Sequence, residues 1–186
     1  MKNLVFALTL VAAMAASAEL KLGTVDMMLL VKNHPNYDSN KALLESTDKD
    51  YQKKVGDIKS EGDSLQNEGK KLMEQMRNPM LTAKAKADIE KQLGEIQQKL
   101  MGIEQRYRSE AMRCRQDLQD LEGRLLRTTT DDLRKRINKY AEANGFDLII
   151  DQTAAAYAKK SFDVTDGLLK ELGVDPKNAK GRDEGK

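Results

Sequence analysis

Apolar residues recur at alternating steps of three and four along residues 37–76 and 80–143, two stretches separated by Asn78 and Pro79. We call the positions reached by these steps the seam of each stretch. The first seam comprises Leu44, Asp48, Tyr51, Val55, Ile58, Gly62, Leu65, Gly69, Leu72 and Met76. The second comprises Ile89, Leu93, Ile96, Leu100, Ile103, Tyr107, Glu110 and Cys114. This heptad spacing predicts two long amphipathic helices that pack as a coiled coil.

The two seams fit each other if the chain folds back at Pro79. Pairing residues whose numbers sum to 158 places Leu65 opposite Leu93 and Gly62 opposite Ile96, so that a small residue faces a large one. A seam of two helices closes without voids when small and large side chains meet in this way. We therefore expect an antiparallel hairpin, an arm roughly 60 Å long at about 1.5 Å per helical residue.

The same register predicts one acidic layer in the arm, because Asp48 would lie opposite Glu110. Like charges in a partly buried layer repel each other and lose hydration. The apolar spacing also changes at Tyr107, where a stutter locally unwinds a coiled coil. We interpret Asp48 and Glu110 as a candidate joint near the root of the arm. The alternative is a solvated edge of an ordinary coiled coil.

Shorter elements precede and follow the arm. Residues 20–26 alternate in the manner of a strand, and Asp26 is a suitable N-cap for a short helix over 27–32. Residues 146–151 and 154–159 indicate two further strands. Asp163 then caps a last short helix expected over 164–172, which Gly173 closes.

These elements predict an α+β fold that is mainly α, a long antiparallel coiled-coil hairpin on a small β-strand body. Residues 19–36 and 144–173 form the body, and residues 37–143 form the arm, whose tip lies near 77–81. Residues 174–186 are expected to be a polar, disordered tail. Three short strands do not make a stable sheet in one copy, so we expect the bodies of several chains to associate.

The amino terminus has the features of a secretory signal peptide. Lys2 precedes an apolar run over residues 4–14, and small residues lead to a cleavage site after Ala18. We therefore expect an exported, periplasmic protein. Its composition, 33% charged and 4% aromatic, excludes one large globular core. The formal net charge of +2 does not indicate nucleic-acid binding, and we predict no nucleic-acid partner.

Residues suited to catalysis are few. His34 is the only histidine, and beside Pro35 we expect it to be a surface loop residue. Cys114 is the only cysteine and lies on the apolar stripe, so we interpret it as a small buried hydrophobe rather than a redox site. The chain lacks nucleophile, phosphate-binding and metal-ligand motifs. We predict no catalytic residue, no metal and no cofactor.

Four segments together resemble one known family. They are Lys21–Asp26 (KLGTVD), Phe146–Asp151 (FDLIID), Ala154–Tyr157 (AAAY) and Asp163–Asp166 (DVTD), which flank the helical hairpin. With them the mature chain up to about Leu172 resembles the Skp (OmpH-like) family. The resemblance implies a homotrimer with a small β body and three helical tentacles. It also implies an ATP-independent holdase chaperone that keeps unfolded outer-membrane proteins from aggregating.

This chain departs from the best-known members of that family in its charge and its tail. Those members are markedly basic and this mature chain is nearly neutral, so we expect at most weak contact with a membrane surface. The segment beyond Gly173 is an addition to the family pattern.

Apolar residues near the expected tip are the candidate client contacts, namely Met73, Met76, Met80 and Leu81. Methionine repacks around varied partners, which a chaperone with many clients requires. The alternative is that these residues only close the tip of the hairpin. A structural coiled-coil protein of the cell envelope, without chaperone activity, is the alternative function.

Overall fold

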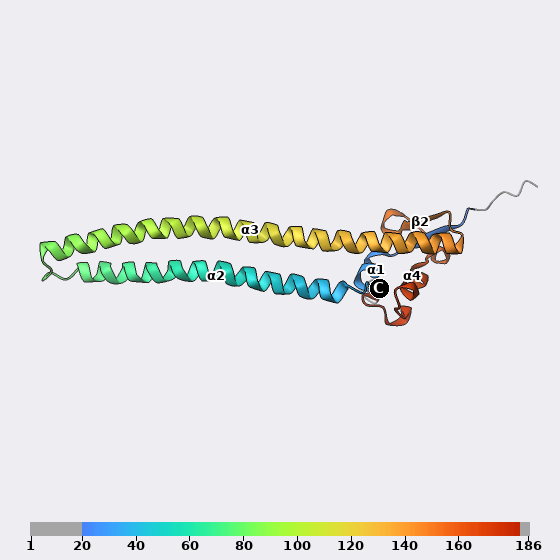
Figure 1. Ribbon diagram of the computed structural model, residues 1–186, viewed down its shortest axis with the longest axis horizontal. Coiled ribbons are helices and arrows are strands. Elements are labelled where there is room, and N and C mark those ends of the chain that lie inside the picture. Colours follow the sequence, from blue (N-terminus) through green and yellow to red (C-terminus); the bar gives the residue numbers. More distant parts are fainter. Residues whose placement is uncertain (1–19, 183–186) are drawn as a thin grey trace, which may run out of the picture.

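The computed structural model describes residues 20–182 and has the shape of a long helical hairpin with a small body at one end (Figure 1). The expected signal peptide and its cleavage site after Ala18 lie outside the described residues, as do residues 183–186 of the expected tail.

Two helices form the arm. α2 spans Tyr37–Met76, as predicted, and α3 spans Ala83–Asn144. The second helix begins three residues later than expected because Thr82 is its N-cap and accepts a hydrogen bond from the amide of Ala85 at 3.3 Å. It ends where predicted, since Gly145 adopts a left-handed conformation with φ 67° that glycine tolerates best.

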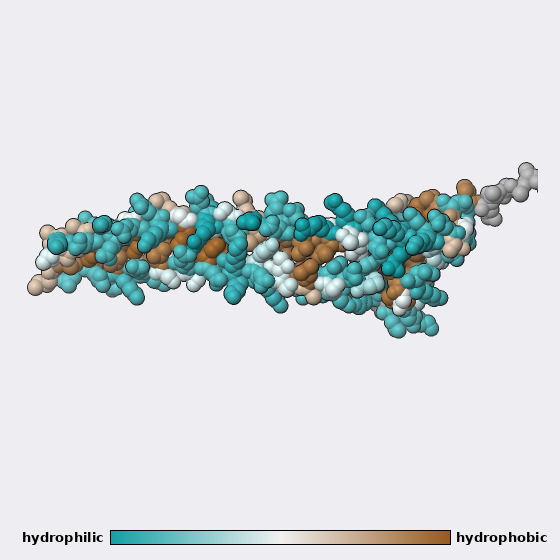
Figure 2. All heavy atoms as spheres, viewed as in Figure 1, coloured by the Kyte–Doolittle hydropathy of each residue, from teal (hydrophilic) through white to brown (hydrophobic). Residues whose placement is uncertain are grey.

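The seam of each helix is the face that packs against the other helix. Every predicted seam residue of α2 is buried or half-buried, and so is every predicted seam residue of α3 except Tyr107, which is 37% exposed. In Figure 2 apolar residues form a narrow band along the line where the helices meet, interrupted by hydrophilic side chains. The predicted coiled-coil pattern is therefore confirmed.

The predicted register of the hairpin is wrong by one heptad. A Cβ atom on Gly62 would lie 3.3 Å from Cγ2 of Ile103, and one on Gly69 would lie 3.6 Å from Cγ2 of Ile96. These contacts join residues whose numbers sum to 165 rather than 158. A shift of seven residues still places seam on seam, so the repeat does not distinguish the two registers.

A parallel two-stranded sheet lies in the body. β1 spans Leu22–Val25 and β2 spans Leu148–Asp151, so each is shorter than the strand expected there. The third predicted strand, over residues 154–159, is wrong. The chain instead forms the 3₁₀ helices η1 (Gln152–Ala154) and η2 (Lys160–Phe162) on either side of that segment. The side chain of Asp151 accepts the amide hydrogen of Thr153 at 3.0 Å and turns the chain away from the strand direction.

The core of the body combines both ends of the chain with the last turns of α3. α1 spans Met27–Lys32, and its predicted N-cap is confirmed, since the Asp26 carboxylate accepts the amide hydrogen of Leu29 at 2.8 Å. α4 spans Thr165–Glu171. The buried apolar core comprises Val25, Leu29, Leu30, Leu133, Leu168, Leu169 and Ala179. Leu133 comes from α3, so this one helix belongs to both arm and body.

The segment after Gly173 packs on the body, so the prediction of a disordered tail is wrong for residues 174–182. The 3₁₀ helix η3 (Pro176–Asn178) precedes Ala179, which is 8% exposed in the core. The Asn33 side-chain amide accepts from the Lys180 amide at 2.9 Å and donates to the Lys180 carbonyl at 3.1 Å. The Lys180 ammonium also lies 2.6 Å from the Asp38 carboxylate at the start of α2.

Candidate functional site

The methionines near the tip differ in how the fold uses them. Met73 is 56% exposed, Met80 is 87% exposed, and Met76 and Leu81 are half-buried. Met73 and Met76 line the same groove between α2 and α3, whereas Met80 and Leu81 lie in the turn and do not line it. The structure therefore brings two of the four candidate contacts together in one cavity.

That cavity, the tip groove, has a volume of about 830 Å³. Its lining is Gln66, Gly69, Lys70, Met73, Met76, Arg77, Leu93, Ile96, Gln97 and Leu100. Gly69 gives the groove its depth, because no side chain fills the space beside Ile96. Its basic residues, Lys70 and Arg77, were not among the sequence candidates. The sequence does contain a signal for them, because Lys70 directly follows the seam position Gly69 and Arg77 directly follows the seam position Met76.

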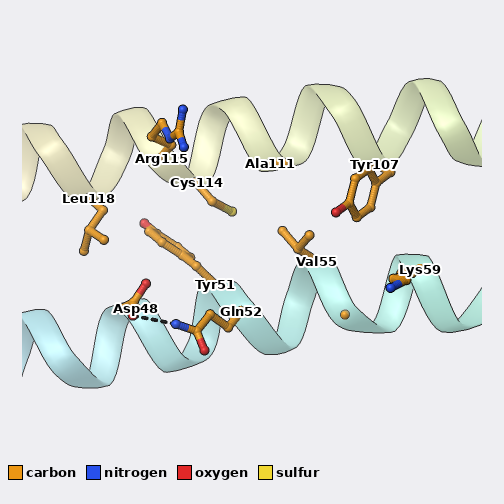
Figure 3. Close-up of a pocket in the computed structure, with 11 residues that line it drawn as sticks. Asp48, Tyr51, Gln52, Val55, Lys59, Tyr107, Ala111, Cys114, Arg115 and Leu118 are labelled. Carbon is orange, nitrogen blue, oxygen red and sulfur yellow. Dashed lines mark hydrogen bonds between the residues drawn. The ribbon is translucent and has the colours of Figure 1, made fainter.

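A second cavity, the mid-arm groove, lies nearer the body and measures about 430 Å³. Tyr51 from α2 and Tyr107 from α3 extend toward the opposite helix along its length (Figure 3). The full lining is Asp48, Tyr51, Gln52, Val55, Gly56, Lys59, Tyr107, Ala111, Cys114, Arg115 and Leu118. The groove coincides with the predicted stutter, where the spacing of apolar residues changes.

The two carboxylates of the candidate joint do not face each other. Glu110 forms an ion pair with Lys54, and the Asp48 carboxylate accepts a hydrogen bond from the Gln52 amide at 2.7 Å. The hydrogen bond with Lys54 lowers the pKa of the Glu110 carboxyl, and the same bond raises the pKa of Lys54. The predicted acidic layer is therefore wrong, because it depended on the register. The joint itself stays a prediction.

Cys114 is buried on the seam, as predicted, and is 6% exposed. Burial raises the pKa of its thiol, and the neighbouring Glu110 carboxylate adds to that increase. A thiol with a raised pKa is largely protonated at neutral pH and reacts slowly. This arrangement agrees with a packing role.

His34 is buried, so the expectation of a surface loop residue is wrong. Its Nε2 lies 3.1 Å from the Asp132 carboxylate, and its Nδ1 accepts the amide hydrogen of Asn36 at 3.1 Å. Arg136 donates to the same carboxylate at 2.7 Å. The hydrogen bond from Arg136 lowers the pKa of Asp132, and the bond with His34 lowers it further. This cluster fastens the start of α2 to α3.

Apolar side chains are also exposed on the body. Met28 is 66% exposed and Leu126 is 54% exposed, and both line a groove of about 560 Å³. Val25, Met27, Val31, Ile137 and Ile149 contribute further apolar lining. Leu148 on β2 is 51% exposed, and within residues 20–182 no strand pairs with the outer edge of β2. We call the groove around Met28 and Leu126 the body patch.

The described part of the chain has neither a candidate metal cluster nor a helix suited to crossing a membrane. Between residues 20 and 182, no cluster of three or more His, Cys, Asp or Glu side chains could hold a metal ion. None of the helices described there combines the length and apolarity that crossing a bilayer requires.

Comparison with known proteins gives one family. The family model described as outer membrane protein (OmpH-like) matches residues 21–172, from the strand β1 to the end of α4. No curated protein matches the chain. The grooved hairpin and its small body lie within the matched residues, apart from the tail segment 173–182. The chain therefore belongs to the OmpH-like family, a family known for periplasmic chaperones and not for enzymes.

Proposed function

We propose that this protein is an ATP-independent holdase of the periplasm, which binds unfolded outer-membrane proteins between its helical arms and keeps them from aggregating. The observation that carries the proposal is the hairpin with apolar grooves in its seam. A holdase must bind many unrelated sequences through weak contacts, and exposed methionines suit that task. Met73, Met76, Met80 and Leu81 are the proposed client contacts near the tip.

A homotrimer assembled through the body is part of the same proposal. The body patch supports it, because Met28 and Leu126 are exposed in an apolar groove that Ile149 of β2 also lines. Exposed apolar surface and an open strand edge both favour association. Sedimentation equilibrium of residues 19–186 should give three chains per particle. Met28→Asp should dissociate the trimer, whereas Met112→Asp, on an arm residue that is 73% exposed, should not. A wild-type protein that stays monomeric at micromolar concentration would exclude the trimer.

The proposed location is the periplasm, which the family supports. The signal peptide expected over residues 1–18, with cleavage expected after Ala18, supports the same location. The balanced charge supports only weak contact with a membrane surface. The same balance gives no support for binding of nucleic acid.

The holding activity is tested by light scattering. An outer-membrane β-barrel protein is diluted from urea into buffer with and without the mature chain. We expect the mature chain to suppress aggregation equally well with and without ATP. A structural coiled-coil protein would leave aggregation unchanged, and that result would overturn the proposal in favour of the alternative.

A further inference from the structure

The tip groove and the mid-arm groove open on the same side of the hairpin. In α2 each is lined by seam residues and by the residues that follow them, such as Gly69 with Lys70 and Val55 with Gly56. In α3 the same holds for Ile96 with Gln97. Two antiparallel helices run in opposite directions, so their chains turn in opposite senses when both are viewed from the same end of the hairpin. Residues that follow the seam therefore lie on the same side of the hairpin in both helices. We call this side the grooved face.

The opposite side is crossed by ion pairs. Lys54 pairs with Glu110, and Glu61 pairs with Arg106. Lys54, Glu61 and Arg106 each precede a seam residue, so they lie away from the grooves. Among residues 20–182, these are the two ion pairs that join α2 to α3. The two sides of the arm therefore differ, since one is bridged by charged side chains and the other exposes the apolar seam.

Most of the charged residues that line the two grooves are basic. Four lining residues are basic, namely Lys59 and Arg115 in the mid-arm groove and Lys70 and Arg77 in the tip groove. The one acidic lining residue, Asp48, already accepts a hydrogen bond from Gln52. An occupant with carboxylates beside its apolar side chains would complement these grooves, although the whole chain is nearly neutral.

The spacing of the grooves suits an extended chain. Val55 and Met73 lie in the two grooves, and because Met73 comes 18 positions after Val55, they are about 27 Å apart along the helix at about 1.5 Å per residue. An extended polypeptide covers that distance with about eight residues. One unfolded segment can therefore place an apolar side chain in each groove.

We propose that the grooved face is the client-binding surface of each arm. We further infer that it selects unfolded segments whose apolar side chains, about eight residues apart, are flanked by carboxylates. This inference rests on the holdase function proposed above and adds which side of the arm binds and what chemistry it prefers.

The test compares charge reversals on the two sides of the arm. Lys70→Glu combined with Arg115→Glu alters one basic residue in each groove. The matched control, Lys71→Glu combined with Lys99→Glu, changes the same number of exposed charges at positions preceding the seam. Circular dichroism and sedimentation establish that both variants keep the wild-type helix content and assembly.

Binding is measured by fluorescence anisotropy of two labelled peptides. Both carry aromatic residues eight positions apart, separated by Asp and Glu in one and by Lys in the other. The wild-type chain should bind the acidic peptide more tightly. The groove variant should lose on the order of fivefold to tenfold in affinity for it, and the control should stay within about twofold.

Each outcome decides the inference. Equal loss in the two variants, or tighter binding of the basic peptide, would overturn the grooved face as the selective surface. A groove variant that changes the oligomeric state without losing peptide affinity would overturn it too, and would make this face a contact between arms. If the wild-type chain also fails to suppress aggregation, the holdase function fails. If it suppresses aggregation while both variants behave alike, only the assignment of the face fails.

Discussion

Gly56 lies in the middle of α2, and an added methyl group there would meet no atom within 4 Å. Glycine in a helix interior is less favourable than alanine by about 0.8–1.0 kcal/mol, because the unfolded chain has more freedom to lose. Gly56→Ala should therefore raise the free energy of unfolding by about 1 kcal/mol per chain.

Gly62 is the matched comparison on the same helix. A Cβ atom there would lie 3.3 Å from Cγ2 of Ile103, so the isoleucine would have to move by a few tenths of an ångström. The gain in helix propensity is then offset by strain in the seam. We expect Gly62→Ala to stabilise the chain by less than Gly56→Ala, or to destabilise it.

Urea denaturation followed by circular dichroism at one fixed protein concentration measures both variants, since stability of an assembly depends on concentration. The expected difference corresponds to roughly 2–4 °C in thermal midpoint for a chain of this size. If Gly56→Ala is no more stable than Gly62→Ala, position 56 is not open. The open surroundings of Gly56 in the single hairpin would then not exist in solution.

Three further predictions concern the body, the tail and the seam. Leu133→Ala removes a core side chain that is 1% exposed, so the free energy of unfolding measured in urea should fall by about 2–5 kcal/mol. Asn33→Ala breaks both hydrogen bonds with Lys180, so trypsin should cleave the tail faster while a helix content equal to wild type serves as control. The pKa of Glu110 is lowered by its ion pair with Lys54, so this pair stabilises the fold at pH values above the pKa of Glu110 in the unfolded chain. The stabilisation is lost as the pH falls through the pKa of Glu110 in the folded chain. Lys54→Met should therefore raise the Glu110 pKa in a carbon-13 NMR titration, and an unchanged value would contradict the ion pair.

Local signals in the sequence were sufficient for much of the fold. The bounds of α1 and α2, the cap at Asp26 and the end of α3 at Gly145 could be predicted from neighbouring residues. His34 differs, because its burial depends on Asp132, which is 98 positions away. The packing of the tail likewise depends on contacts between Asn33 and Lys180, 147 positions apart.

The candidate site was only partly predictable for a related reason. Met73 and Met76 could be identified from their type and position near the tip. The grooves could not, since their depth and charge depend on which turn of α2 meets which turn of α3. A heptad repeat is unchanged by a shift of seven residues, so the sequence allowed Asp48 to be paired with Glu110 when Lys54 is the actual partner.

α3 is continuous from Ala83 to Asn144, with no proline between these residues and a length of about 93 Å. A helix without such a break curves gently along its length rather than kinking at one point. A sideways force on the tip of the arm would therefore bend α3 along its length, down to Leu133, which anchors the helix in the core of the body. α2, which joins the body through the turn at residues 33–36, would have to slide along α3 as the arm bends. An arm pushed outward by a bulky occupant would in this way bend elastically and exert a restoring force on that occupant.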